Sequence, residues 1–157
     1  MKFESSLGTI WLNADPHFLT QISYTPIDEH PLANQTLLLQ AQTQILEYLN
    51  GERKAFDLPY AFEYGTVFQQ AVWHALAKIP YGSTCSYQAV AESIQRPKAV
   101  RALGQANRKN PLPILIPCHR VIGKGGQLVG YSGSSAEGLK IKQQLLALEN
   151  LEFKIND

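Results

Sequence analysis

The residues best suited to covalent chemistry lie in one short segment, in which Cys118 is followed directly by His119 and Arg120. A thiolate is a strong nucleophile, and an adjacent imidazole and an adjacent cation can both help a thiol to ionise. Buried cysteines are usually inert packing residues, so Cys118 considered alone favours a structural role. Its two neighbours, together with the surrounding prolines, favour a reactive thiol held in a fixed place.

An element must position this thiol, and the local sequence suggests which. Residues 110–121 place Pro111, Pro113 and Pro117 around an apolar stretch. Proline fixes φ and stiffens the chain. We therefore predict an extended, buried strand that delivers Cys118 to one site.

The composition is that of a globular protein, with 45% hydrophobic and 17% charged residues. Cys85 and Cys118 are the only cysteines, which is too few for a disulfide framework, and no C-x-x-C pair indicates a zinc site. No apolar run approaches the roughly 18 residues needed to span a bilayer. We expect a cytoplasmic protein that has no metal and does not enter the membrane.

Charge divides the chain near Gly65. Residues 1–64 hold three Lys or Arg against eight Asp or Glu, a net charge of −5, whereas residues 65–157 hold eleven against five, a net charge of +6. Eight basic residues and a single acid, Glu92, lie between Lys78 and Lys124. This concentration is typical of a phosphate-backbone binder. A solvated basic face without a partner would give the same pattern.

The first 64 residues predict a small α+β unit. Residues 7–13 and 18–25 are short apolar-rich segments separated by a turn signal, which predicts a β-hairpin. A helix is expected from about residue 34 to residue 50, where Gly51 marks its end. Its apolar positions recur at helical spacing: Leu38, Ala41, Ile45 and Leu49. Residues 52–64 carry Pro59 and no clear period, so we place a linker there and a domain boundary between residues 64 and 65.

Residues 65–157 predict a mainly helical unit. Thr66 and Gln69 have the spacing of a capping box at a helix start. Ser86 can cap a second helix that ends near Ile94, and Pro97 fits the first position of a third helix that runs to about Arg108. The inner face of the first helix consists of Phe68, Val72, Leu76 and Ile79.

The second and third of these helices, joined by a tight turn, indicate a helix-turn-helix. The third helix is expected to carry Lys98, Arg101, Arg108 and Lys109, with the small residues Ala102, Gly104 and Ala106 among them. Small side chains would let such a basic helix approach DNA closely. The pattern therefore favours a DNA-binding unit.

The box Pro117-Cys118-His119-Arg120-Val121 resembles the acceptor site of the methylated-DNA–protein-cysteine methyltransferases, also called alkylguanine-DNA alkyltransferases. Other segments between Thr66 and Glu149 resemble the family in the same order: residues 79–82, 86–87, 96–102, 107–121 and 130–132. The resemblance implies an alkyltransferase DNA-binding and acceptor domain over residues 65–157. It also implies that residues 1–64 form the small ribonuclease-H-like α/β domain that the family carries.

The resemblance assigns the chemistry residue by residue. Cys118 would accept the alkyl group from O6 of guanine in an in-line displacement. His119, through a bound water and backed by Glu149, would help the thiol to ionise. Tyr87 would donate to guanine N3 as the base leaves, and Asn110 would order the active-site turn.

The resemblance also predicts how DNA is held. A base inside a duplex cannot present O6 to a buried sulfur, so it must be flipped out. Arg101 matches the family arginine that fills the gap, and the backbone near Tyr131 and Ser132 would cover O6. The expected partner is double-stranded DNA containing O6-alkylguanine, bound by a monomer in the minor groove with little sequence specificity. The predicted DNA contacts are Lys98, Arg101, Ala102, Arg108, Tyr131 and Ser132.

Transfer would leave a thioether with no good leaving group, so each molecule would act once. Direct transfer needs no cofactor, and no glycine-rich nucleotide motif is present. The zinc-binding cysteines of some relatives are missing from residues 1–64, so no zinc is expected. After Tyr131, residues 133–138 resemble a short insertion relative to the family, and we expect it to alter which alkyl groups fit.

Two other functions are compatible with parts of the sequence. One is a protein that binds alkylated DNA without chemistry, as do relatives that lack the acceptor cysteine. The other is a hydrolase in which His119 is the general base for Cys118. Adjacent Cys and His residues rarely have the geometry for that reaction, and Cys118 is present, so both are weaker alternatives.

Overall fold

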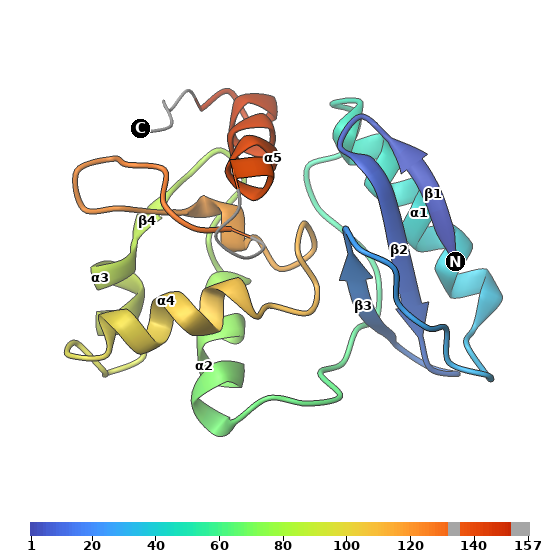
Figure 1. Ribbon diagram of the computed structural model, residues 1–157, viewed down its shortest axis with the longest axis horizontal. Coiled ribbons are helices and arrows are strands. Elements are labelled where there is room, and N and C mark those ends of the chain that lie inside the picture. Colours follow the sequence, from blue (N-terminus) through green and yellow to red (C-terminus); the bar gives the residue numbers. More distant parts are fainter. Residues whose placement is uncertain (132–135, 152–157) are drawn as a thin grey trace. The chain divides into compact units, whose positions relative to one another are not determined.

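A computed structural model describes residues 1–131 and 136–151. The chain forms two compact units, Met1–Tyr64 and Gly65–Asp157, each with its own buried apolar core (Figure 1). The predicted mixture of helices and strands is confirmed. Among the described residues, no helix is both long enough and apolar enough to cross a bilayer.

The first unit is a three-stranded antiparallel sheet with one helix against it (Figure 1). The strands are β1 (Lys2–Ser5), β2 (Gly8–Ala14) and β3 (Leu19–Ser23), in that order. The predicted hairpin corresponds to β2 and β3. The edge strand β1 was not predicted, because Phe3 is its only apolar and only buried residue.

Helix α1 (Gln35–Leu49) follows the prediction closely. The Asn34 side chain accepts a hydrogen bond from Leu37 N, which caps the first turn. Gly51, just beyond the helix, has a φ of 78°, a conformation that suits glycine. The buried face of α1 consists of Leu37, Leu38, Ala41, Ile45 and Tyr48.

The second unit is mainly helical. Helices α2 (Val67–Leu76), α3 (Tyr87–Ser93) and α4 (Val100–Arg108) pack against one another, and α5 (Ala136–Leu148) packs against the 3-10 helix η1 (Cys118–Arg120). Both bonds of the predicted Thr66–Gln69 capping box are present, and Ser86 caps α3. The indole of Trp73 donates to the Ala106 carbonyl at 2.8 Å, which ties α2 to α4.

Pro97 does not begin α4, so that prediction is wrong. Ala99 N donates to Arg96 O at 3.0 Å, which closes a turn over residues 96–99. Pro97 occupies the second position of this turn, where its fixed φ fits well. The helix starts only at Val100, so Lys98 lies in the turn before α4.

Residues 110–121 are buried, as expected, but they do not form an extended strand. Ile116 N donates to Leu112 O at 2.8 Å, so the chain turns back on itself. The Asn110 side chain holds this turn from inside, accepting from Leu112 N at 3.0 Å and donating to Ile116 O at 2.8 Å. Prolines without N–H groups cannot complete a β-ladder, and the turn leads directly into η1.

Only Val121–Ile122 of this region is a strand, β5, and it pairs in parallel with β4 (Cys85–Ser86). Because Ser86 also caps α3, this short pairing links the start of α3 to the end of η1. The acceptor segment is thus fixed by turns and side-chain hydrogen bonds rather than by a sheet.

Candidate active site

Cys118 is the first residue of η1 and is only 3% exposed. Burial raises the pKa of its thiol to about 11, against the opposing effects of a hydrogen bond from Asn110 and the charge of Lys142. Such a thiol is almost wholly protonated at neutral pH. It therefore needs a base that takes its proton during the reaction.

His119 and Glu149 form a fully buried pair beside this thiol. His119 Nε2 lies 2.8 Å from Glu149 Oε2. Burial lowers the pKa of His119, so its ring is neutral at neutral pH. Because an ionised carboxylate can only accept hydrogen bonds, Nε2 carries the ring proton and Nδ1 is the basic nitrogen.

Glu149 follows the last residue of α5 and is held as an anion. Burial pushes its pKa upward, but hydrogen bonds from His119 and Arg120 outweigh this effect and hold the pKa at about 2. The backbone N–H of Gly82 also donates to Glu149 Oε1, at 2.9 Å. The carboxylate thus stabilises the cation that forms when His119 takes a proton.

The Arg120 guanidinium forms hydrogen bonds with the Glu149 carboxylate rather than with the Cys118 thiol. Its Nε lies 2.9 Å from Glu149 Oε1 and its Nη2 lies 3.0 Å from Glu149 Oε2, while Nη1 donates to Ile79 O at 2.6 Å. From the sequence, Arg120 is expected to help Cys118 to ionise through its charge. Its guanidinium is instead committed to the carboxylate that supports His119.

Tyr87 is the first residue of α3, and its hydroxyl donates to the Val129 carbonyl at 2.6 Å. Burial raises the pKa of this hydroxyl to about 12, and the charge of an ionised Cys118 raises it further, whereas Arg108 lowers it. The hydroxyl therefore keeps its proton at neutral pH. The influence of Cys118 on this pKa places Tyr87 in the same electrostatic environment as the thiol.

Lys142, which aligns in the sequence with the helix lysine of the family, is completely buried on α5. Its Nζ contacts the carbonyls of Val121, Val129 and Gly130, and its charge acts on Cys118. A sequence signal was available, because Lys142 lies four residues after Gly138 and three before Leu145, both of which are buried on α5. A lysine in this register cannot point into solvent.

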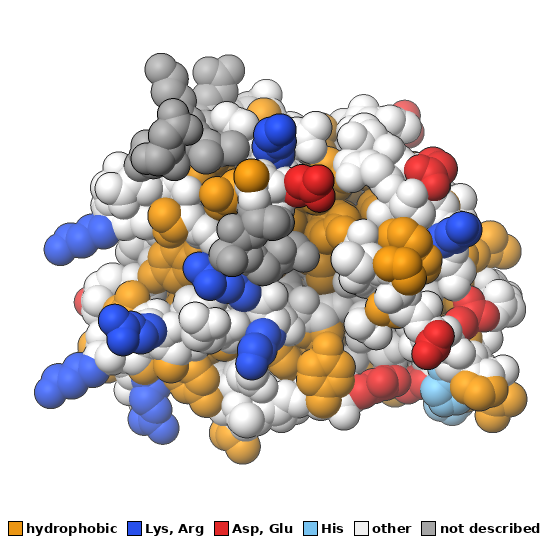
Figure 2. Space-filling view, in the orientation of Figure 1, with side chains coloured by type: hydrophobic (Ala, Val, Ile, Leu, Met, Phe, Trp, Pro, Cys, Tyr) orange, Lys and Arg blue, Asp and Glu red, His pale blue; other side chains and the backbone are white. Residues whose placement is uncertain are grey.

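The residues predicted to contact DNA fall into two groups. Arg101, Ala102 and Arg108 lie exposed on α4, and Lys98 lies exposed just before it, whereas Tyr131 is buried. Figure 2 shows Lys and Arg side chains gathered around α3 and α4. Ser132 lies outside the described residues. So do residues 133–135 of the predicted insertion, while Ala136 to Gly138 belong to the first turn of α5.

A cavity of about 270 Å³ lies between α4 and Tyr87. Tyr87 and Val129 form one side of it, and Arg101 and Arg108 of α4 form another. The cavity is bordered further by Val100, Gly104 and Gln105. A group that enters from α4 therefore meets the hydroxyl of Tyr87.

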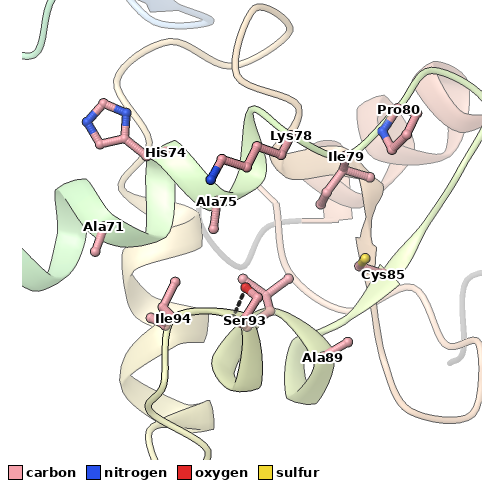
Figure 3. A pocket seen from close by; sticks show the side chains of 11 residues that line it. Ala71, His74, Ala75, Lys78, Ile79, Pro80, Cys85, Ala89, Ser93 and Ile94 are labelled. Carbon is pink, nitrogen blue, oxygen red and sulfur yellow. Dashed lines mark hydrogen bonds between the residues drawn. The ribbon is translucent and has the colours of Figure 1, made fainter.

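Cys85, the other free cysteine, has different surroundings (Figure 3). It borders a cavity of about 300 Å³ between α2 and α3, lined by small and apolar side chains with His74 and Lys78. The His119–Glu149 pair and Tyr87 are not among the lining residues. Cys118 is thus the cysteine with an acid–base apparatus. In residues 1–131 and 136–151, no three His, Cys, Asp or Glu side chains gather as a metal site requires.

Comparison with known proteins places the chain in one family. The sequence model of the 6-O-methylguanine DNA methyltransferase DNA-binding domain matches residues 67–151. The constitutive methylated-DNA–protein-cysteine methyltransferase of Bacillus subtilis (strain 168) is 53% identical over 117 residues, which cover 74% of this chain and 68% of that protein. The methylated-DNA–protein-cysteine methyltransferase of Methanosarcina acetivorans is 43% identical over 153 residues, 94% of this chain and 95% of that protein.

A solved structure supports the same family assignment. The crystal structure of Mycobacterium tuberculosis OGT in complex with DNA matches with a TM-score of 0.81 and 39% sequence identity, over 95% of this chain and 91% of that one. The resemblance seen in the sequence is thereby confirmed. The chain belongs to the methylated-DNA–protein-cysteine methyltransferases, and it repairs DNA by transferring an alkyl group from the damaged base to a protein cysteine.

Proposed function

We propose that Cys118 is the cysteine that receives the alkyl group from O6-alkylguanine, and that each molecule reacts once. The observation that carries this assignment is the buried His119–Glu149 pair, joined at 2.8 Å, directly after Cys118 in the chain. This pair supplies a neutral base that becomes a stabilised cation when it takes a proton. Cys85 borders no such pair.

The reaction begins with transfer of the Cys118 proton to Nδ1 of His119, directly or through one water molecule. The thiolate then attacks the alkyl carbon; the new S–C bond forms as the C–O6 bond breaks, and that electron pair passes to guanine. Tyr87 donates a hydrogen bond to guanine N3 and so stabilises the departing base. The product thioether has no good leaving group, so the transfer is irreversible and needs no cofactor.

Residues 65–157 bind double-stranded DNA in this proposal, with α3 and α4 as a helix-turn-helix and α4 in the minor groove. Support comes from the exposed Arg101, Ala102 and Arg108 of α4 and from the DNA complex of the M. tuberculosis relative. Arg101 fills the space that the flipped base leaves. Lys98 contacts phosphate, and the backbone near Tyr131 and Ser132 covers O6.

Residues 1–64 correspond in this proposal to the ribonuclease-H-like domain of the family, for which the β1–β3 sheet and α1 give support. The protein acts as a monomer, because one chain contains every group that the reaction uses. It acts in the cytoplasm, where reducing conditions keep the Cys118 thiol free.

The test is intact-mass measurement after incubation with a duplex that carries one O6-methylguanine. We expect one methyl group per chain, located on Cys118 by peptide mapping and absent in Cys118→Ala. Cys85→Ser is the matched control and should react as the wild type does. A methyl group on Cys85, no mass change, or turnover beyond one lesion per chain would each contradict the proposal.

A further inference from the structure

Asn107 is the polar member of the buried face of α4. The other buried residues of this helix are Leu103 and Ala106, and Asn107 is itself only 1% exposed. Asparagine is a poor helix former, and burying its amide costs free energy unless the amide is well hydrogen-bonded. An asparagine on this face therefore needs a reason other than packing.

One end of the Asn107 amide contacts the backbone of the residue proposed to accept the alkyl group. Its Nδ2 donates to the Cys118 carbonyl oxygen over 3.5 Å, which is long for a hydrogen bond. The same carbonyl accepts a hydrogen bond from the backbone N–H of Val121. Cys118 O would thus keep a partner without Asn107, so this long bond does not explain the asparagine.

The other end of the amide is an acceptor that no protein group uses. Because Cys118 O can only accept, Nδ2 faces it and Oδ1 is turned away from it. Within residues 1–131 and 136–151, no side chain or backbone group donates to Oδ1, although this atom is buried. A buried acceptor without a donor destabilises a fold, and most such atoms in proteins are paired. Oδ1 is therefore suited to a donor that enters with the substrate.

The alkylated base offers only one group that can donate to Oδ1. Alkylation of O6 leaves guanine N1 without a proton, and O6, N3 and N7 only accept, so the exocyclic 2-amino group carries every N–H bond of the base. O4-alkylthymine has no N–H bond, because its N3 loses the proton in the same way. A base whose alkyl carbon meets the Cys118 sulfur lies against Cys118, whose carbonyl Asn107 contacts.

We propose that Asn107 determines which alkylated base is repaired, with its Oδ1 accepting a hydrogen bond from the 2-amino group of flipped O6-alkylguanine. This inference rests on the proposed role of Cys118 as the acceptor of the alkyl group. The hydrogen bond favours alkylated guanine over alkylated thymine, which cannot form it. Asn107 neither moves a proton nor takes part in the displacement, so it affects the choice of base and not the chemistry of transfer.

Asn107→Leu separates this role from a structural one. Leucine has the same branched shape without polar atoms, and Cys118 O stays bonded to Val121 N. The urea midpoint should therefore stay unchanged or rise, because an amide with an unused acceptor is replaced by an apolar group. Methyl transfer from an O6-methylguanine duplex should nevertheless slow by about tenfold, the order of magnitude expected for one hydrogen bond.

The test compares three duplexes that differ only in the lesion, which is O6-methylguanine, O6-methylhypoxanthine or O4-methylthymine. O6-methylhypoxanthine is O6-methylguanine without the 2-amino group. Single-turnover rates of methyl transfer are followed by intact mass for the wild type and for Asn107→Leu. The guanine-to-hypoxanthine rate ratio should be about tenfold smaller in the variant, and the guanine-to-thymine ratio should fall with it. The intrinsic reactivities of the bases are the same for both proteins, so a changed ratio reports the contact.

Gln144→Leu is the matched control, because it removes an exposed carboxamide from α5, and its ratios should equal those of the wild type. If Asn107→Leu slows transfer from all three lesions equally, Asn107 only maintains the structure around Cys118 and the inference is wrong. A fall in stability with unchanged ratios, as expected where Oδ1 holds a buried water, also overturns it. Should Asn107→Leu not fold, Asn107→Ala takes its place and must show the same fall in both ratios.

Failure of this inference is distinguishable from failure of the proposed function. A wild-type protein that does not place the methyl group of O6-methylguanine on Cys118 contradicts the proposed function, whatever Asn107 does. A wild type that methylates Cys118, accompanied by Asn107 variants with unaltered rate ratios, contradicts only the role of Asn107.

Discussion

His119 and Arg120 both form hydrogen bonds with the buried Glu149 carboxylate, and this arrangement determines where the Cys118 proton can go. Glu149 remains ionised because its hydrogen-bond donors outweigh the effect of burial on its pKa. His119 is neutral because burial lowers its pKa, so it is ready to accept a proton. Without Arg120, the carboxylate would be a buried charge with less compensation, and its pKa would rise.

This arrangement predicts acid sensitivity. The folded state lowers the Glu149 pKa from its ordinary value of 4.5 to about 2, so ionised Glu149 favours folding above pH 4.5. That contribution, on the order of 3 kcal/mol, is lost as pH falls from about 5 to 2. The lowered pKa of His119 acts in the same direction below its ordinary value of 6.5.

Urea unfolding at several pH values measures this effect. Glu149→Gln should lower the free energy of unfolding by about 3 kcal/mol at pH 7, because Arg120 loses its partner. The gap between the variant and the wild type should narrow steadily below pH 5. Glu137→Gln, at an exposed position of α5, is the control and should show no such gap. A wild-type advantage that stays constant with pH would refute the assignment.

At the scale of helices and turns, the sequence correctly predicted the features that depend on hydrogen bonds between residues close together in the chain. Thr66 and Ser86 cap their helices through bonds to residues three positions away, so spacing alone reveals them. The shape of residues 110–121 depends instead on the Asn110 side chain bonding across the turn to Ile116. Neither periodicity nor proline content reports such a bond, and the segment was wrongly predicted to be extended.

The candidate site, like the fold, was predicted only in part from the sequence. The Cys118-His119 pair is contiguous, and the resemblance assigned Glu149 a role beside it, where the structure places its carboxylate. The contacts of Lys142, by contrast, are with three backbone carbonyls that only the fold brings around its Nζ. These carbonyls belong to a segment with no regular pattern, so periodicity alone does not reveal the contacts of Lys142.

A substitution at Gly104 tests how closely helix α4 approaches DNA. Gly104 is a helical residue, and a Cβ built there meets no atom within 4 Å. Gly104→Ala should therefore stabilise the protein by about 0.5–1 kcal/mol, because glycine is a poor helix former. The added methyl group borders the cavity that Arg101 and Tyr87 share, so we expect weaker binding to O6-methylguanine duplex.

Urea unfolding measures the stability of Gly104→Ala, and titration with O6-methylguanine duplex measures its affinity for DNA. The control is Thr43→Ala, an exposed position of α1 in the other unit. It also replaces a weaker helix former with alanine, so it should stabilise the protein without altering DNA affinity. If Gly104→Ala binds DNA as tightly as the wild type does, α4 is not the element that enters the groove.

For the molecule as a whole, the division of charge sets how binding responds to salt. Arg120 and Lys142 are buried, so the net charge of +6 on residues 65–157 overstates what DNA can meet. The exposed cations near α4 include Lys98 and Lys109, one before the helix and one at its end. Lysines that contact phosphate release counterions when they bind, and each contributes to the salt dependence.

Duplex affinity measured from low to high salt should fall along a straight line of log affinity against log salt. Lys98→Gln and Lys109→Gln should each reduce the slope by about 0.9, the amount expected for one phosphate contact. Lys2→Gln removes an exposed lysine from the acidic unit and should leave the slope unchanged. An equal loss of slope in Lys2→Gln would mean that DNA binding draws on the charge of the whole protein. In that case the basic half would not be the DNA-binding surface.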